Sequence, residues 1–110
     1  MKRLEVKDLL PYGLMYSENG ALHQEVLDNA RQAYQHFQRV YVGIQSVATD
    51  ELIDMLDRIS QDLAEIFELS KGRAGDNQRY TRLLYSAVLD YFVQKDLLTD
   101  YLKKYPVYVE

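Results

Sequence analysis

The chain of 110 residues has no cysteine and no tryptophan, and only two prolines and five glycines. The lack of cysteine excludes disulfides, thiolate metal sites and cysteine nucleophiles, so packing alone must hold the core. Long apolar runs are also missing. Glu5, Lys7, Asp8 and Pro11 interrupt the apolar residues behind the basic start, so we expect neither a signal-peptide core nor a membrane-spanning segment. These absences fit one cytoplasmic domain over residues 1–110.

A basic surplus is lacking as well, because 17 acidic residues outweigh 13 lysines and arginines, for a net charge of -4. Binding to nucleic acid normally requires a clustered basic surface that releases counterions from the phosphates. We therefore expect no nucleic-acid partner. The ten tyrosines suit core edges and interfaces, because each joins a large apolar ring to a polar hydroxyl.

The stretch Asn77–Lys95 is the most apolar part of the chain. Placed on a helix at about 100° per residue, its apolar residues cover roughly two thirds of the circumference. A polar strip is left, with Val93 straying into it: Arg79, Arg82, Ser86 and Asp90. A helix of this kind must be covered on more than one side, so we predict that it is the central helix of a bundle, with Leu84 and Val88 in the core.

Three segments repeat apolar residues at helical spacing, which predicts helices near residues 21–46, 50–70 and 77–104. Thr49 is the expected N-cap of the second helix. The sequence does not decide whether the third helix breaks at Asp96. Residues 1–20 form an arm, helical or extended, because Pro11 and Gly13 interrupt it. We predict an all-α fold, an antiparallel bundle of three to four helices with a short N-terminal arm.

The end of the chain concentrates aromatic and basic side chains, which makes it the candidate site for binding a partner. Pro106 ends the last helix, and we expect the tail 106–110 to be too short for a sheet and to have no role in the core. Tyrosines and lysines suit a protein interface or an anionic membrane surface, although the end could also simply be frayed. The candidate partner-binding residues are Tyr101, Lys103, Lys104, Tyr105 and Tyr108.

Paired acids at a spacing of three residues occur on the second predicted helix, at Asp54 and Asp57 and at Asp62 and Glu65. A di-metal site in a bundle would also need inward glutamates and a Glu-x-x-His motif, which the sequence lacks. Arg58 is placed to pair with Asp54 along the helix. We interpret these acids as a solvated face, with a docking surface for a basic partner as the alternative, and expect no metal, cofactor or catalytic residue.

Two further patterns were weighed as functional sites. Arg31 and His36 match the R-x4-H spacing of HEPN-type ribonucleases, but residues five apart on a straight helix point roughly 140° away from each other. His36 and His23 are therefore expected at the surface or its rim. The loop over residues 71–75 has two bases and two glycines ahead of a helix N-terminus, which suits either an anion site or a flexible connection.

Residues 51–105 resemble the immunity proteins that protect bacteria from pediocin-like (class IIa) bacteriocins. The resemblance lies in ELIDMLDRISQDLAEIFELSKG and in QRYTRLLYSAVLDYFVQKDLLTDYLKKY, which are similar to that family's third and fourth helices. It implies a cytoplasmic four-helix bundle, without catalysis, that recognises a bacteriocin-bound sugar-transport receptor at the inner face of the membrane. The alternative is a small helical adaptor or structural protein of unknown partner that associates with itself, and an enzyme is the third candidate.

Overall fold

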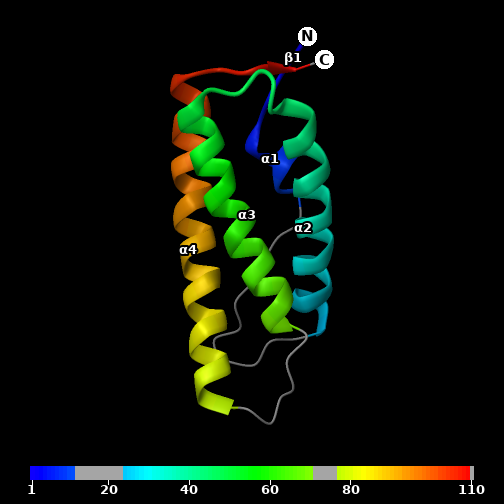
Figure 1. The fold of residues 1–110 in the computed structure, drawn as a ribbon, viewed down its shortest axis with the longest axis vertical. Helices are drawn as coiled ribbons and strands as arrows, with labels where there is room; N and C mark the ends of the chain where they lie inside the picture. Colours follow the sequence, from blue (N-terminus) through cyan, green and yellow to red (C-terminus); the bar gives the residue numbers. More distant parts are fainter. Residues whose placement is uncertain (12–23, 71–76, 110) are drawn as a thin grey trace.

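The computed structural model describes residues 1–11, 24–70 and 77–109 (Figure 1). These residues form an all-α bundle with one small two-stranded sheet, which confirms the predicted fold class. In chain order the elements are β1 (Lys2–Arg3), α1 (Val6–Leu9), α2 (Gln24–Ile44), α3 (Asp50–Ser70), α4 (Asn77–Lys104) and β2 (Tyr108–Val109). The expected helix start at 21–23 and the loop at 71–75 lie outside the described residues.

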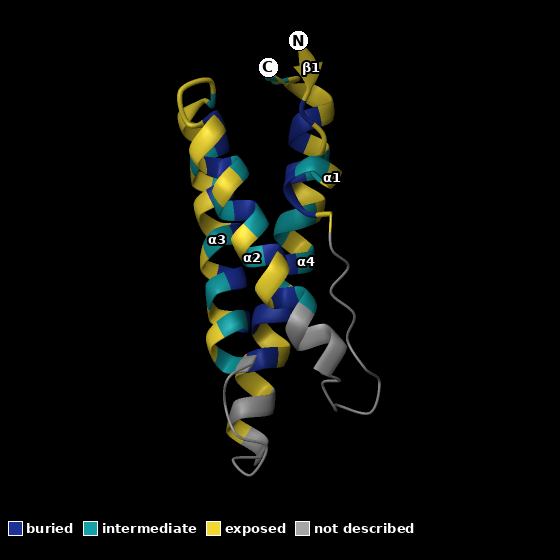
Figure 2. Ribbon diagram, turned by 90° about the vertical axis from the view of Figure 1, so that its right-hand side faces the viewer, coloured by how far each residue is buried: buried dark blue, intermediate teal, exposed yellow. Residues whose placement is uncertain are grey.

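The helix at the centre of the bundle is α3, because it packs against both α2 and α4. Helix α1 lies between α2 and α4 on the side opposite α3 (Figures 1 and 2). The prediction that α4 is central is therefore wrong. Helix α4 lies at an edge of the bundle, and several of its large apolar side chains are exposed, whereas the described apolar residues of α3 are buried or partly buried.

The core is built around the apolar face of α3, whose buried side chains recur at the three-and-four spacing of a helix. The buried residues on α3 are Leu52, Leu56, Ile59, Leu63 and Ile66. Helix α2 contributes Ala33 and Phe37 to the same core, and α4 contributes Leu84, Val88 and Tyr91. Figure 2 shows these buried positions turned inward along the bundle.

The ends of the helices follow from identifiable residues. The Leu52 amide donates a 3.2 Å hydrogen bond to Thr49 Oγ1, which confirms Thr49 as the N-cap of α3. Thr49 Oγ1 also lies 2.7 Å from the Tyr101 hydroxyl, so the start of α3 is joined to the end of α4. Helix α4 runs through Asp96 without a break, which resolves the alternative that the sequence left open.

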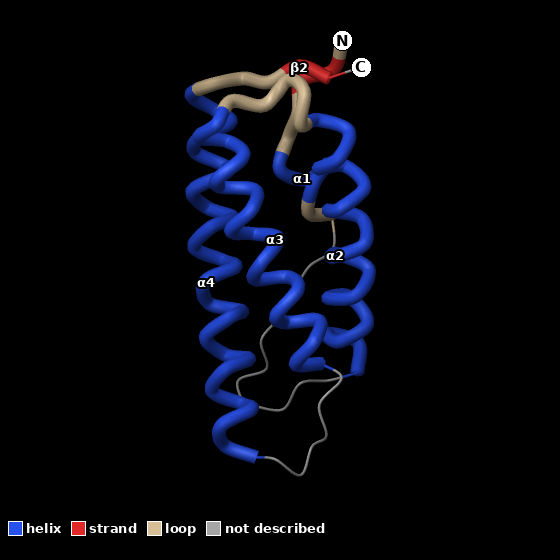
Figure 3. Tube along the Cα trace, in the orientation of Figure 1, coloured by secondary structure: helices blue, strands red, loops and turns tan. Residues whose placement is uncertain are grey.

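The N-terminal arm and the C-terminal tail form the small sheet. Strands β1 and β2 pair antiparallel, with Lys2 opposite Val109 and Arg3 opposite Tyr108 (Figure 3). The Leu4 amide extends this pairing with a 2.7 Å hydrogen bond to the carbonyl of Val107. Val107 and Val109 pack against the core. The expectation that the tail makes no sheet and has no core role is therefore wrong.

Neighbouring leucines on α4 provide a test of its orientation. Leu84 is fully buried, whereas Leu83 is 44% exposed. We predict that Leu84→Ala lowers the free energy of unfolding by about 2–4 kcal/mol and that Leu83→Ala costs less than about 1 kcal/mol, because only the first leaves a cavity. Urea titration of both variants measures the difference. Equal losses would show that the inward face of α4 is misassigned.

Deletion of residues 106–110 tests the pairing of the termini. It removes the partner strand of β1 and the core contacts of Val107 and Val109, so we expect the Tm to fall by about 4 °C or more. The matched variant Tyr108→Ala keeps the backbone pairing and truncates an exposed ring, and its Tm should stay within about 2 °C of the original. An unchanged Tm in the deletion would mean that the tail does not hold the arm.

Candidate functional site

The end of the bundle that carries both termini is the candidate site, because four of the five predicted partner-binding residues are exposed there (Figure 1). Tyr105 and Tyr108 are each about half exposed. Lys104 Nζ lies 5.8 Å from the centre of the Tyr105 ring, within reach of a cation–π contact. Exposed lysines and tyrosines in one place can bind an anionic or aromatic group of a partner.

Tyr101, the fifth predicted residue, does not belong to the exposed surface. Its side chain is only 8% exposed, and its hydroxyl is hydrogen-bonded to Thr49. The ring contacts Tyr105, with 5.1 Å between ring centroids. The assignment of Tyr101 to the binding surface is therefore wrong. The Tyr101 ring packs against the Tyr105 ring, because residues four apart along a helix are neighbours on its surface.

Beside these residues the arm and α4 enclose a cavity of about 510 Å³, which we call the terminal cleft. Its lining joins the start of the chain to its end: Arg3, Leu4, Glu5, Val6, Lys7, Thr99, Leu102 and Lys103. Arg3 Nη2 donates a 3.3 Å hydrogen bond to the carbonyl of Leu102, which holds the arm against α4. The cleft is lined by three cations and one carboxylate, so its charge suits an anionic group.

Sequence reasoning missed Arg3 and Lys7, because only the pairing of β1 with β2 brings them beside Lys103. The available signal was weak. The basic start and the β-branched tail are each short, and strand pairing between segments about 100 residues apart leaves no local periodicity in the sequence.

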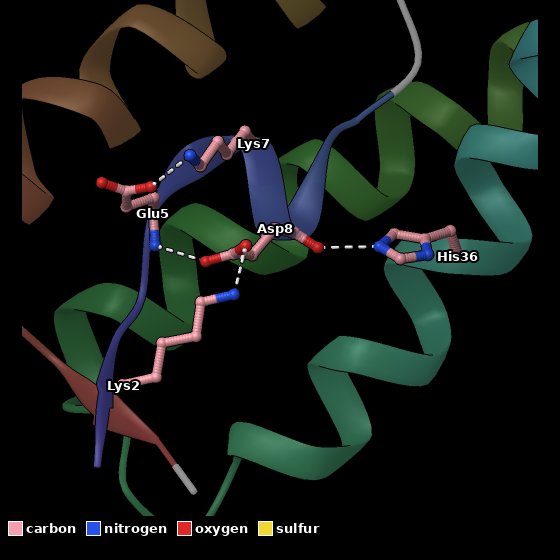
Figure 4. A network of polar contacts seen from close by, with 5 residues as sticks. All are labelled: Lys2, Glu5, Lys7, Asp8 and His36. Atoms are coloured by element: carbon pink, nitrogen blue, oxygen red, sulfur yellow. Dashed lines mark hydrogen bonds and ion pairs between the residues drawn. The ribbon is translucent and has the colours of Figure 1, made fainter.

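A polar network holds the arm in place (Figure 4). Asp8 accepts hydrogen bonds from the Glu5 amide at 2.9 Å and from Lys2 Nζ at 3.0 Å, and the Glu5 amide contributes most to holding the pKa of Asp8 below its usual value. Lys7 is paired with Glu5 at 3.0 Å, which raises the pKa of Lys7. His36 Nε2 on α2 donates a 2.7 Å hydrogen bond to the carbonyl of Asp8. The network orients the arm that lines the terminal cleft.

The hydrogen bond to Asp8 gives His36 a structural role, which is a different explanation of this residue from the ribonuclease pattern. The imidazole is half buried against the arm, and Arg31 is exposed on α2. The pair was expected to diverge on a straight helix, and α2 is one continuous helix over both residues. His23 lies outside the described residues.

The acids of α3 do not all form a solvated face. Asp62 is only 6% exposed, and one of its carboxylate oxygens is buried without a hydrogen-bond partner among the described residues. Arg58 does not pair with Asp54 as predicted; its Nε donates a 3.0 Å hydrogen bond to Asp90 on α4. Asp57 accepts a hydrogen bond from the Tyr41 hydroxyl on α2. Asp57 thus links α3 to α2, and Arg58 links α3 to Asp90 on α4. Asp54 is exposed as expected.

Asp62 on α3 and Asp90 on α4 form a pair of interacting carboxyl groups at the interface of the two helices. Burial and the hydrogen bond to Asp90 raise the pKa of Asp62 to about 7. The pKa of Asp90 is lowered, first by its hydrogen bond to Asp62 and then by Arg58. The two carboxyl groups therefore titrate as a pair, and the higher pKa lies with the buried Asp62. None of the residues that line the terminal cleft belongs to this pair, so we assign it to the helix interface.

The raised pKa of Asp62 predicts a pH dependence of stability. The folded state binds this proton more tightly than the unfolded chain, so its contribution grows as the pH falls from about 7 to about 4 and is lost above pH 7. Asp62→Asn mimics the protonated form, so we expect it to stabilise the protein at pH 8 by about 1–3 kcal/mol and to have little effect at pH 5. Urea titrations at the two pH values measure this. If Asp62→Asn instead lowered the stability at pH 8, the ionised Asp62 carboxylate would not be destabilised by its burial.

Among residues 1–11, 24–70 and 77–109, no three His, Cys, Asp or Glu side chains gather to hold a metal ion. No helix in the same part of the chain is long and apolar enough to cross a membrane. Comparison of the chain with family models, with curated proteins and with solved structures finds no match. The case for a function therefore depends on the geometry of the site itself.

Proposed function

We propose that this protein is a non-catalytic binding protein that holds its partner at the end of the bundle where the termini meet. The observation that carries the proposal is the terminal cleft, where Arg3, Lys7 and Lys103 converge from both ends of the chain. Exposed Tyr105 and Tyr108 extend the same surface. Cations beside aromatic rings recognise acidic and aromatic groups of a protein, so the partner is a protein with an acidic segment.

The specific form of this function that we propose is immunity to a pediocin-like bacteriocin, exercised in the cytoplasm on a membrane-receptor complex. The all-α bundle agrees with the fold that the resemblance implies. A surface of lysines and tyrosines also suits the anionic inner face of a membrane, where such a receptor is reached. A neighbouring gene for a small secreted peptide containing Tyr-Gly-Asn-Gly would support this form.

Protection of a sensitive host tests the proposal. Expression of the chain should allow growth in the presence of the matching bacteriocin, and Lys103→Glu should reduce protection at least about tenfold because it reverses a charge in the cleft. Arg31→Glu is the matched control, since it makes the same charge change at an exposed site on α2. Both variants should keep the Tm. Equal protection by the original chain and Lys103→Glu would remove the cleft from the functional account.

A self-associating adaptor is the second candidate function, and a separate observation favours it. Helix α4 exposes Leu89, Val93 and Leu97, which form an apolar surface, in contrast to the charged lining of the terminal cleft. A homo-oligomer would cover these side chains.

A further inference from the structure

The outer face of α4 is the largest concentration of exposed apolar side chains on the described part of the chain. Leu89, Val93 and Leu97 are 47%, 54% and 47% exposed and recur every four residues, which places them in one ridge along the helix. Leu83 and Tyr85 lie at its margins and are also exposed. None of the described large apolar side chains of α3 is exposed to this degree, and on α2 the exposed Val42 stands alone, so the described exposed apolar side chains gather on α4.

Charges of opposite sign flank the ridge. Arg82 is exposed before it, and Asp96 and Asp100 are exposed on the C-terminal side. Arg82 and Asp100 lie equally far along the helix from the level of Tyr91, about 13 Å in each direction at 1.5 Å per residue. Leu89 and Val93 are also placed symmetrically about that level. The face therefore has Leu89 and Val93 in its middle, beside the exposed Ser86. Arg82 lies towards one end, and Asp96 and Asp100 lie towards the other, ahead of Lys103 and Lys104.

We infer that the occupant of this face is a second copy of the same chain, with the two α4 helices packed antiparallel about a two-fold axis at the level of Tyr91. In this arrangement Leu89 of one protomer packs on Val93 of its partner, and Arg82 meets Asp100 at both ends. A parallel arrangement would place Arg82 beside Arg82 and Asp100 beside Asp100, so repulsion selects the antiparallel one.

The size of the face sets the strength of the dimer. Residues 82–100 span roughly 27 Å of helix about 10 Å wide, or roughly 270 Å² on each protomer, which is below the area that stable interfaces bury and fits only a weak, transient dimer. The Kd should therefore be on the order of 10–100 μM. The dimer forms and dissociates with protein concentration.

Sedimentation equilibrium of the full chain, from about 5 to about 500 μM, tests this inference. The average mass should rise from that of one chain towards that of two. Val93→Glu should weaken dimerisation at least about tenfold, because it places a charge in the apolar middle. The matched control Val42→Glu makes the same change at an exposed site on α2 and should leave the Kd unchanged.

A charge exchange tests the register and guards against misfolded variants. Arg82→Asp and Asp100→Arg should each weaken the dimer several-fold, and the double variant should restore it. A chain that stays monomeric up to about 500 μM would overturn the inference. A double variant no stronger than the single variants would overturn the antiparallel pairing.

Discussion

The burial of one face of α3 is the constraint on which the rest of the structure depends. Its leucines and isoleucines are covered on one side by α2 and on the other by α4, so both outer helices are positioned by the same stripe. Polar links at the margins of the stripe, from Tyr41 to Asp57 and from Arg58 to Asp90, join α3 to each neighbour. Helix α4 packs against α3 and, near its end, against α1 and the arm, while the face with Leu89, Val93 and Leu97 is exposed.

The pairing of the termini adds a second constraint, which creates the candidate site. The arm is held by β2, by Leu102 and by His36, so residues from the start of the chain line a cleft with residues from its end. The binding surface therefore depends on contacts that close the whole chain. The outer face of α4 has a different chemistry, apolar with charged residues nearby, so the proposed partner site and the proposed dimer face use different surfaces.

The sequence predicted local features well and long-range ones poorly. The bounds of α3 and α4 and the N-cap Thr49 were predicted correctly, because apolar periodicity and capping are properties of neighbouring residues. The choice of central helix was wrong, since a broad apolar circumference indicates that a helix needs cover but not where the cover comes from. On α4, part of that apolar surface is left exposed within the single chain.

The errors within the site have a similar cause. Lys103, Lys104, Tyr105 and Tyr108 are exposed, whereas Tyr101 is buried and its hydroxyl is hydrogen-bonded to Thr49, about 50 residues away, which the sequence does not reveal. Asp62 was assigned to a solvated face because it was interpreted together with Glu65 as a pair of acids three residues apart on one face. Only the approach of Asp90 from α4 makes that position an interior one.

Native-state hydrogen exchange of the full chain tests most directly the claim that α3 organises the bundle. The account predicts that amides in the middle of α3 exchange only through global unfolding, while amides of the arm and of the ends of α4 exchange through smaller openings. The opening free energies of the α3 amides should therefore be the largest in the protein and equal to the free energy of unfolding from urea titration. Slower exchange in the middle of α4 than in α3 would contradict it.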